Sequence, residues 1–132
     1  MSGNIDPQLK LRLLWLGIGY LLIALVILLS LTSQPVFIGL PFAYEDKVYH
    51  TFAYFALMAW FAQIYHGRLQ RNITAVFLIS LGLLLEYLQS LNPARYAEYG
   101  DMLANTTGVA LGYALALSKA KNILVGIEKL IR

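Results

Sequence analysis

The chain has 132 residues, a length suited to one domain, and 59% of its residues are hydrophobic while only 13% are charged. A soluble domain carries about 25% charged residues, so this composition excludes a mostly water-exposed surface and predicts one that faces lipid. The absence of cysteine excludes disulfides, thiolate metal ligands and cysteine nucleophiles. The net charge is only +3, and no basic stretch interleaved with aromatic residues suggests a nucleic-acid partner.

Four apolar segments in chain order are predicted to be transmembrane helices of a single domain, residues 1–132. These spans are residues 13–31, 48–65, 73–91 and 102–117. A helix needs about 20 residues to cross the hydrocarbon layer. The second and fourth spans reach that length only if their polar starts, Asp46 to Val48 and Asp101 to Asn105, belong to the helix. The expected fold is therefore all-α, an integral membrane four-helix bundle.

The basic residues predict the orientation, because loops on the cytoplasmic side of a membrane are enriched in Lys and Arg. Eight of the ten basic residues fall on the side of the two termini, and only Lys47 and Arg95 fall on the other side. Five of the seven acids accompany Lys47 and Arg95. Both termini are therefore expected in the cytoplasm. No acid or base falls in the inner half of the predicted spans, which argues against a transport path.

The C-terminal tail, residues 119–132, has its apolar residues on one helical stripe. They are Ile123, Leu124, Ile127, Leu130 and Ile131. This pattern fits a basic amphipathic helix on the inner membrane surface, and a frayed extension of the fourth span explains it equally well. His66, between the second and third spans, is expected to be solvated.

Polar residues of three predicted spans fall at similar depth, on the side opposite the termini. They are Asp46, His50 and Tyr54 on one helix face, Glu86 and Gln89 on another, and Asp101 and Asn105 on a third. An ionisable face should point into the bundle, because exposing it to lipid costs several kcal/mol. Gly108-x-x-x-Gly112 allows close helix approach. The sequence predicts one polar cluster in the outer half of a tight bundle, with Arg95 in the loop above it.

These residues form ordered and specifically spaced motifs. They read Asp46-Lys47-x-x-His50-x-x-x-Tyr54, then Glu86-x-x-Gln89, Arg95, and Asp101-x-x-x-Asn105-x-x-Gly108-x-x-x-Gly112. The motifs resemble those of the VanZ-like membrane protein family over residues 45–112. The resemblance implies a multi-pass protein of the bacterial cytoplasmic (inner) membrane. The family takes its name from a member linked to resistance to the glycopeptide teicoplanin, so the resemblance also raises a relation to that resistance.

The candidate catalytic residues are His50, Glu86 and Asp101. A histidine beside a carboxylate can act as an acid–base pair. The alternatives are a histidine that hydrogen-bonds between helices, a structural salt bridge at Glu86, and helix capping by Asp46 or Asp101. A metal site built from the three candidate catalytic residues is a further possibility, but no motif such as H-E-x-x-H supports it. We expect no metal and no cofactor.

The candidate binding residues are Asp46, Lys47, Tyr54, Gln89, Arg95 and Asn105. Lys47 and Arg95 can hold the phosphate of a lipid head group, for which the arginine fork is well shaped. One hypothesis is therefore a site that binds or modifies an anionic lipid or a lipid-linked cell-envelope precursor. The other is a non-enzymatic membrane scaffold or accessory subunit with a membrane-protein partner, in which the cluster only fixes helix register.

Overall fold

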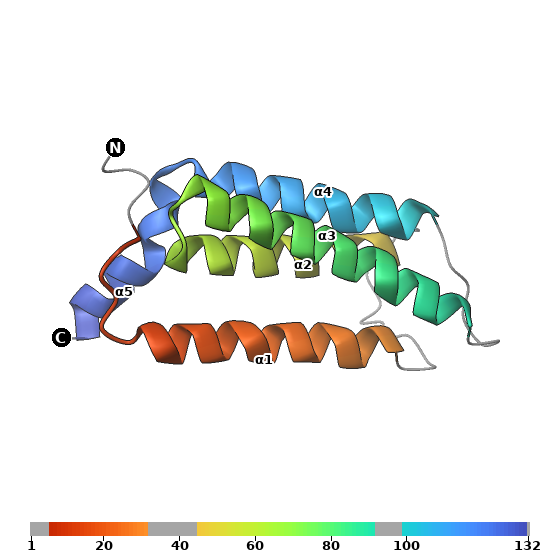
Figure 1. Cartoon of the computed structure of the whole chain (residues 1–132), viewed down its shortest axis with the longest axis horizontal. Coiled ribbons are helices and arrows are strands. Elements are labelled where there is room, and N and C mark those ends of the chain that lie inside the picture. The colour runs from red at the N-terminus through yellow and green to blue at the C-terminus, as the bar shows by residue number, and fades with distance from the viewer. Residues whose placement is uncertain (1–5, 32–44, 92–98, 132) are drawn as a thin grey trace.

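The computed structural model describes residues 6–31, 45–91 and 99–131, and within these ranges every regular element is a helix. The elements are α1 (Arg12–Leu31), α2 (Glu45–Ile64), α3 (Arg68–Ser90), α4 (Tyr99–Ala116), the 3₁₀-helix η2 (Lys119–Asn122) and α5 (Ile123–Ile131). The expected all-α class is confirmed for this part of the chain. Figure 1 shows α1 to α4 aligned along the long axis, with α5 at one end.

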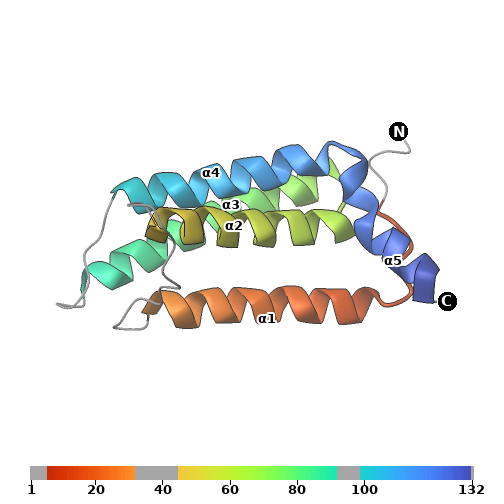
Figure 2. The ribbon, with the colours of Figure 1, turned by 180° about the vertical axis from the view of Figure 1, so that it is seen from behind.

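The four long helices alternate in direction, so each end of the bundle has the N-termini of two helices beside the C-termini of the other two (Figures 1 and 2). α1 and α3 begin where α2 and α4 finish, beside α5. We call this the α5 end. α2 and α4 begin at the opposite end, which we call the Asp101 end because Asp101 lies in the first turn of α4. The antiparallel order predicted from the sequence therefore brings the starts of α2 and α4 together.

α2 and α4 approach closely because glycines replace side chains between them. A Cβ atom on Gly108 would lie 2.3 Å from the carbonyl oxygen of Thr51, and one on Gly112 would lie 2.8 Å from that of Phe55. The close approach expected from the G-x-x-x-G pattern is thus confirmed. The main apolar core lies along this contact and includes Tyr54, Leu57, Met58, Leu78 and Val109.

Two of the described helices, α1 and α3, are long and apolar enough to cross a membrane. Only 11% of the apolar window in α1 and 28% of that in α3 are buried inside the protein. A core helix of a soluble protein would be mostly covered, so these exposed apolar surfaces point to a membrane protein. α2 and α4 do not pass the same test, since both begin with polar residues such as Lys47 and Asp101.

The helix bounds agree with the predicted spans to within three residues, except at the start of α3. This helix begins at Arg68 and not at residue 73. Arg71 therefore lies on the inward face of α3, in line with Leu78 and Leu85, and it is buried. The earlier start of α3 thus brings a basic side chain into the bundle at a position that the predicted span, residues 73–91, left outside the helix.

The C-terminal tail is a separate element and not a frayed end of α4. α4 stops at Ala116, and the hydroxyl of Ser118 accepts a hydrogen bond from the Ala120 amide at the start of η2. In α5, Leu124 is buried against Leu9, Trp15 and Ile64. The predicted apolar stripe is therefore divided, because Leu124 packs inside the protein while its other four members are exposed.

Candidate functional site

An ion pair joins the first turns of α2 and α4. The Nζ atom of Lys47 lies 2.6 Å from Oδ1 of Asp101. The first turn of α4 favours a carboxylate, because the helix dipole is positive there and the first N–H groups lack partners within the helix. Gly100 leaves room for the lysine stem, since a Cβ atom at this position would lie 2.9 Å from Cε of Lys47. The local sequence of α4 thus both places the carboxylate and admits its cation.

His50, one turn after Lys47, connects the same two helices. Its Nδ1 atom lies 2.9 Å from Oδ1 of Asn105, and its Nε2 atom lies 3.8 Å from Oδ2 of Asp101. Because the assigned partner of Nδ1 is a carbonyl oxygen, Nδ1 donates the hydrogen bond. Nε2 then carries a proton only in the imidazolium form, which would face the carboxylate of Asp101. In the neutral ring Nε2 is therefore the basic nitrogen, and it faces the carboxylate of Asp101.

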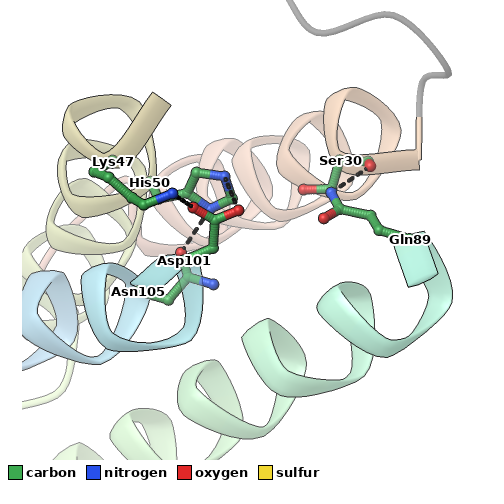
Figure 3. Close-up of polar contacts among 6 residues, drawn as sticks. All are labelled: Ser30, Lys47, His50, Gln89, Asp101 and Asn105. Carbon is green, nitrogen blue, oxygen red and sulfur yellow. Dashed lines mark hydrogen bonds and ion pairs between the residues drawn. The ribbon is translucent and has the colours of Figure 1, made fainter. Parts of the chain in front are cut away.

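Figure 3 shows Lys47, His50, Asp101 and Asn105 as one cluster, and its four side chains differ in exposure. The side chains of Lys47 and His50 are 22% and 18% exposed, whereas that of Asp101 is 9% exposed. Asn105 is buried. A group approaching from outside therefore meets Lys47 and His50 first, with Asp101 behind them as their common charge partner.

Glu86 of α3 and Tyr54 of α2 are both buried in the bundle. Glu86 lies on α3, one turn after Gly82, and a Cβ atom on Gly82 would lie 3.0 Å from Nδ2 of Asn105. The glycine thus lets α3 pack against α4 at the level of the cluster. The inward direction predicted for Glu86 is confirmed by its burial.

Gln89 lies apart from the cluster (Figure 3). Its Nε2 atom donates a hydrogen bond of 2.6 Å to the carbonyl oxygen of Ser30 in the last turn of α1. The amide of Gln89 therefore ties α3 to α1. The other two candidate binding groups, Arg95 and the side chain of Asp46, lie outside the described part of the structure.

Within the described ranges, no three His, Asp or Glu side chains converge closely enough to hold a metal ion. Every buried side-chain nitrogen and oxygen described in the structure also has a hydrogen-bond partner. The cluster places a cation, an imidazole and a carboxylate close together, as the groups that a ligand could contact.

A second polar layer, at the α5 end, is not evident from the sequence motifs. The buried guanidinium of Arg71 donates hydrogen bonds of 2.8 to 3.0 Å to the carbonyl oxygens of Tyr65, Ala116 and Ala62. Carbonyls at helix C-termini lack partners within the helix, so one arginine satisfies the ends of both α2 and α4. Arg71 lies seven residues before the buried Leu78, so the two share one face of α3. This spacing predicts a buried arginine once the helix is taken to begin before residue 73.

His66 belongs to this layer and is only 5% exposed, so the prediction of a solvated histidine is wrong. Its Nε2 atom lies 3.1 Å from the carbonyl oxygen of Lys121, and its backbone N–H donates to Oδ1 of Asp6. Burial lowers the pKa of His66 below its usual 6.5, and the charges of Arg71 and Lys121 lower it further. The neutral imidazole is therefore favoured at this position.

The sequence matches the family model VanZ/LLP1 over residues 13–124. This range begins in α1 and ends in the first turn of α5, so it includes the whole cluster at the Asp101 end. No curated protein and no solved structure matches the chain. The match covers most of the chain and agrees with the motifs around His50, Glu86 and Asp101, and the protein thus belongs to the VanZ/LLP1 family.

Proposed function

We propose that the Asp101 end binds the phosphate of an anionic lipid or of a lipid-linked cell-envelope precursor. The observation that carries the proposal is the partly exposed pair of Lys47 and His50 in front of the buried carboxylate of Asp101. A phosphate arriving here meets the lysine ammonium and the imidazole together. Arg95, in the segment between α3 and α4, is the only other basic residue that the sequence assigns to the side opposite the termini.

His50 is the residue through which such a site would act on a bound molecule. A step on a phosphate ester needs a group that gives or takes a proton, and Nε2 of His50 faces Asp101 at 3.8 Å. The family is associated with teicoplanin resistance. Altered handling of lipid-linked envelope precursors is the route by which this site would bear on that resistance.

The proposal includes a membrane topology in which α1 to α4 all cross the bacterial cytoplasmic membrane, with both termini inside. α2 has 20 residues and α4 has 18, which gives lengths of about 27 to 30 Å at about 1.5 Å per residue. Their polar starts face each other, so lipid does not have to solvate them. The eight basic residues on the side of the termini fit a cytoplasmic face there.

Single cysteines test this topology, because the chain has none of its own. Leu91, at the end of α3, and Asn122, in η2, are both exposed. In intact cells, an impermeant maleimide should label Leu91→Cys, and it should label Asn122→Cys only after lysis. Equal labelling of the two variants before lysis would contradict the orientation.

Native mass spectrometry of the full chain tests ligand binding at the Asp101 end. The probes are phosphatidylglycerol and a polyprenyl phosphate, which share the phosphate but differ in the lipid. The site variant is Lys47→Gln with Arg95→Ala. The control is Arg68→Gln, because Arg68 is exposed and lies at the α5 end.

We expect the wild type and the control to retain one probe, and the site variant to bind it about tenfold or more weakly, because it lacks charged hydrogen bonds. The probe that is retained identifies the lipid class. Equal retention by all three proteins, each shown to be folded, would exclude a ligand site at this end.

A non-enzymatic scaffold is the second candidate, and one observation favours it. Every buried polar side-chain atom in the described residues is already satisfied within the protein, as a purely structural cluster requires. On this hypothesis His50→Ala and Glu86→Gln lower folding stability without a selective loss of activity, and the protein copurifies with a membrane-protein partner. A pull-down in mild detergent that recovers no partner would count against it.

A further inference from the structure

Helix α5 presents two different faces. Leu124 and Glu128 point into the protein and are buried. The other apolar residues form an exposed stripe at helical spacing, which consists of Ile123, Ile127, Leu130 and Ile131. Leu130 is the most exposed of them, at 85%. We call these four residues the α5 stripe.

The outward-facing charges of η2 and α5 within residues 119–131 have one sign. Glu128 is the only acid in residues 119–131, and its carboxylate is turned inward. There it accepts hydrogen bonds from the backbone N–H groups of Lys10 and Leu11 and from Nε1 of Trp15. The charged residues left towards the outside of η2 and α5 are Lys119, Lys121 and Lys129. Burial of the one acid thus leaves a basic border beside an apolar stripe.

The position of α5 fits this surface. Figures 1 and 2 show α5 crossing the end of the bundle from α4 towards the start of α1. α1 and α3, the two helices apolar enough to cross a membrane, both begin at this end. If they cross the bilayer, α5 lies at its boundary.

We propose that the α5 stripe enters the interface of the leaflet at this end of the bundle, and that the three lysines bind its anionic lipid phosphates. Apolar burial and attraction to anionic lipids are the two contributions that hold an interfacial helix. The proposal rests on α1 and α3 crossing the membrane, which is part of the proposed function. It does not depend on a ligand at the Asp101 end. Glu128 caps α1 from the same helix, so membrane contact of α5 also holds the first turn of α1.

A fluorophore attached to a single cysteine tests this contact in the full chain, reconstituted into vesicles. Leu130→Cys places an environment-sensitive dye on the stripe, and Asn122→Cys places the same dye on an exposed polar position in η2. Quenchers attached to lipid acyl chains should quench the dye at residue 130 and leave the dye at residue 122 largely unquenched. The fluorescence of Trp15 and Trp60, the only tryptophans, reports whether each variant is folded.

The lysines are tested by repeating the measurement with Lys119→Gln and Lys129→Gln added to the Leu130→Cys protein. Each lysine near an anionic surface contributes about 1 kcal/mol, or roughly fivefold in partitioning. The two substitutions should thus weaken membrane contact of α5 by about 25-fold in vesicles containing phosphatidylglycerol, and change little in phosphatidylcholine vesicles.

Three results would overturn the proposal. One is equal quenching at residues 122 and 130, and another is identical contact of residue 130 with both kinds of vesicle. The third is a dye at residue 130 that neither the acyl-chain quenchers nor quenchers dissolved in the water can reach. This result would show that a protein surface covers the α5 stripe. Loss of ligand binding at the Asp101 end leaves all three readouts unchanged, so the two proposals fail separately.

Discussion

Oε2 of Glu128 accepts a hydrogen bond of 2.7 Å from the indole Nε1 of Trp15, which lies 113 residues earlier in the chain. The same carboxylate accepts the N–H groups of Lys10 and Leu11 at 2.8 and 2.9 Å. The last helix therefore supplies the cap of the first helix, where N–H groups lack partners and the helix dipole favours a negative charge.

Glu128→Ala should lower the free energy of unfolding by about 1 to 3 kcal/mol, because it leaves buried N–H groups without an acceptor. Unfolding in detergent, followed by tryptophan fluorescence, measures the change, and the native emission should shift because Trp15 loses its partner. Lys129→Ala is the control, since Lys129 is the exposed neighbour on the same helix. Equal stability of the two variants would show that the cap contributes nothing.

Arg71→Lys should destabilise the protein by about 2 kcal/mol or more, although it keeps the charge. An ammonium lacks the planar fork that reaches the ends of α2 and α4 together, so buried carbonyls lose their donors. Arg68→Lys, in the same turn of α3 but exposed, should stay within about 0.5 kcal/mol of the wild type. Chemical denaturation in detergent compares the two, and similar losses would argue against a capping role.

Gly108→Ala should cost about 1 to 3 kcal/mol, because the added methyl group would collide with the backbone of α2 at Thr51. Gly17→Ala is the matched control, since no atom lies within 4 Å of a Cβ atom there. This control should be neutral or gain about 0.5 to 1 kcal/mol from helix propensity. Thermal unfolding of both variants checks the sign, and a neutral Gly108→Ala would show that α2 and α4 are not in tight contact.

The Lys47–Asp101 pair should respond unequally to loss of either partner. Lys47→Met leaves the more buried carboxylate without its cation, at a cost of about 2 to 3 kcal/mol. Asp101→Asn leaves a lysine that is more exposed and can extend into water, so its cost should be smaller. A double-mutant cycle on unfolding free energies measures the coupling. Equal losses from both single variants, with no coupling between them, would show that the ion pair adds no stability.

Acid should destabilise the α5 end through His66. Its folded-state pKa lies below 6.5, chiefly because of burial, so the folded protein binds this proton less readily than the unfolded chain. The contribution of His66 is full above a pH of about 6.5 and is lost as the pH falls below that value. Arg71 and Lys121 add to the effect, while Asp6 and the carbonyl of Lys121 oppose it.

His66→Gln provides the test, because glutamine can still donate to the Lys121 carbonyl but does not titrate. The unfolding temperature should be lower at pH about 5.5 than at pH about 7.5 in both proteins, and this decrease should be smaller for the variant than for the wild type. The same fall in both proteins would assign the acid sensitivity to other groups.

The sequence by itself determined the helices and the meeting of His50, Asp101 and Asn105. Apolar stretches of membrane-spanning length predict helices without knowledge of their neighbours. Helical spacing and alternating direction then place the starts of the second and fourth helices at one level. Gly108 and Gly112 predicted the close contact of the fourth helix with a neighbour, because two helices approach this closely only where no side chain lies between them.

The tertiary structure alone decided the partners at the helix ends. Gln89 bonds to Ser30 rather than to the cluster, and His66 is buried although it was expected to be solvated. Arg71 and Glu128 are buried as well, at helix ends for which the sequence motifs predicted no partners. The physical reason is that helix ends carry N–H and carbonyl groups that must find partners. Which side chain bonds to these groups depends on which helix ends come together in space. The spacing of residues along one helix does not predict that arrangement.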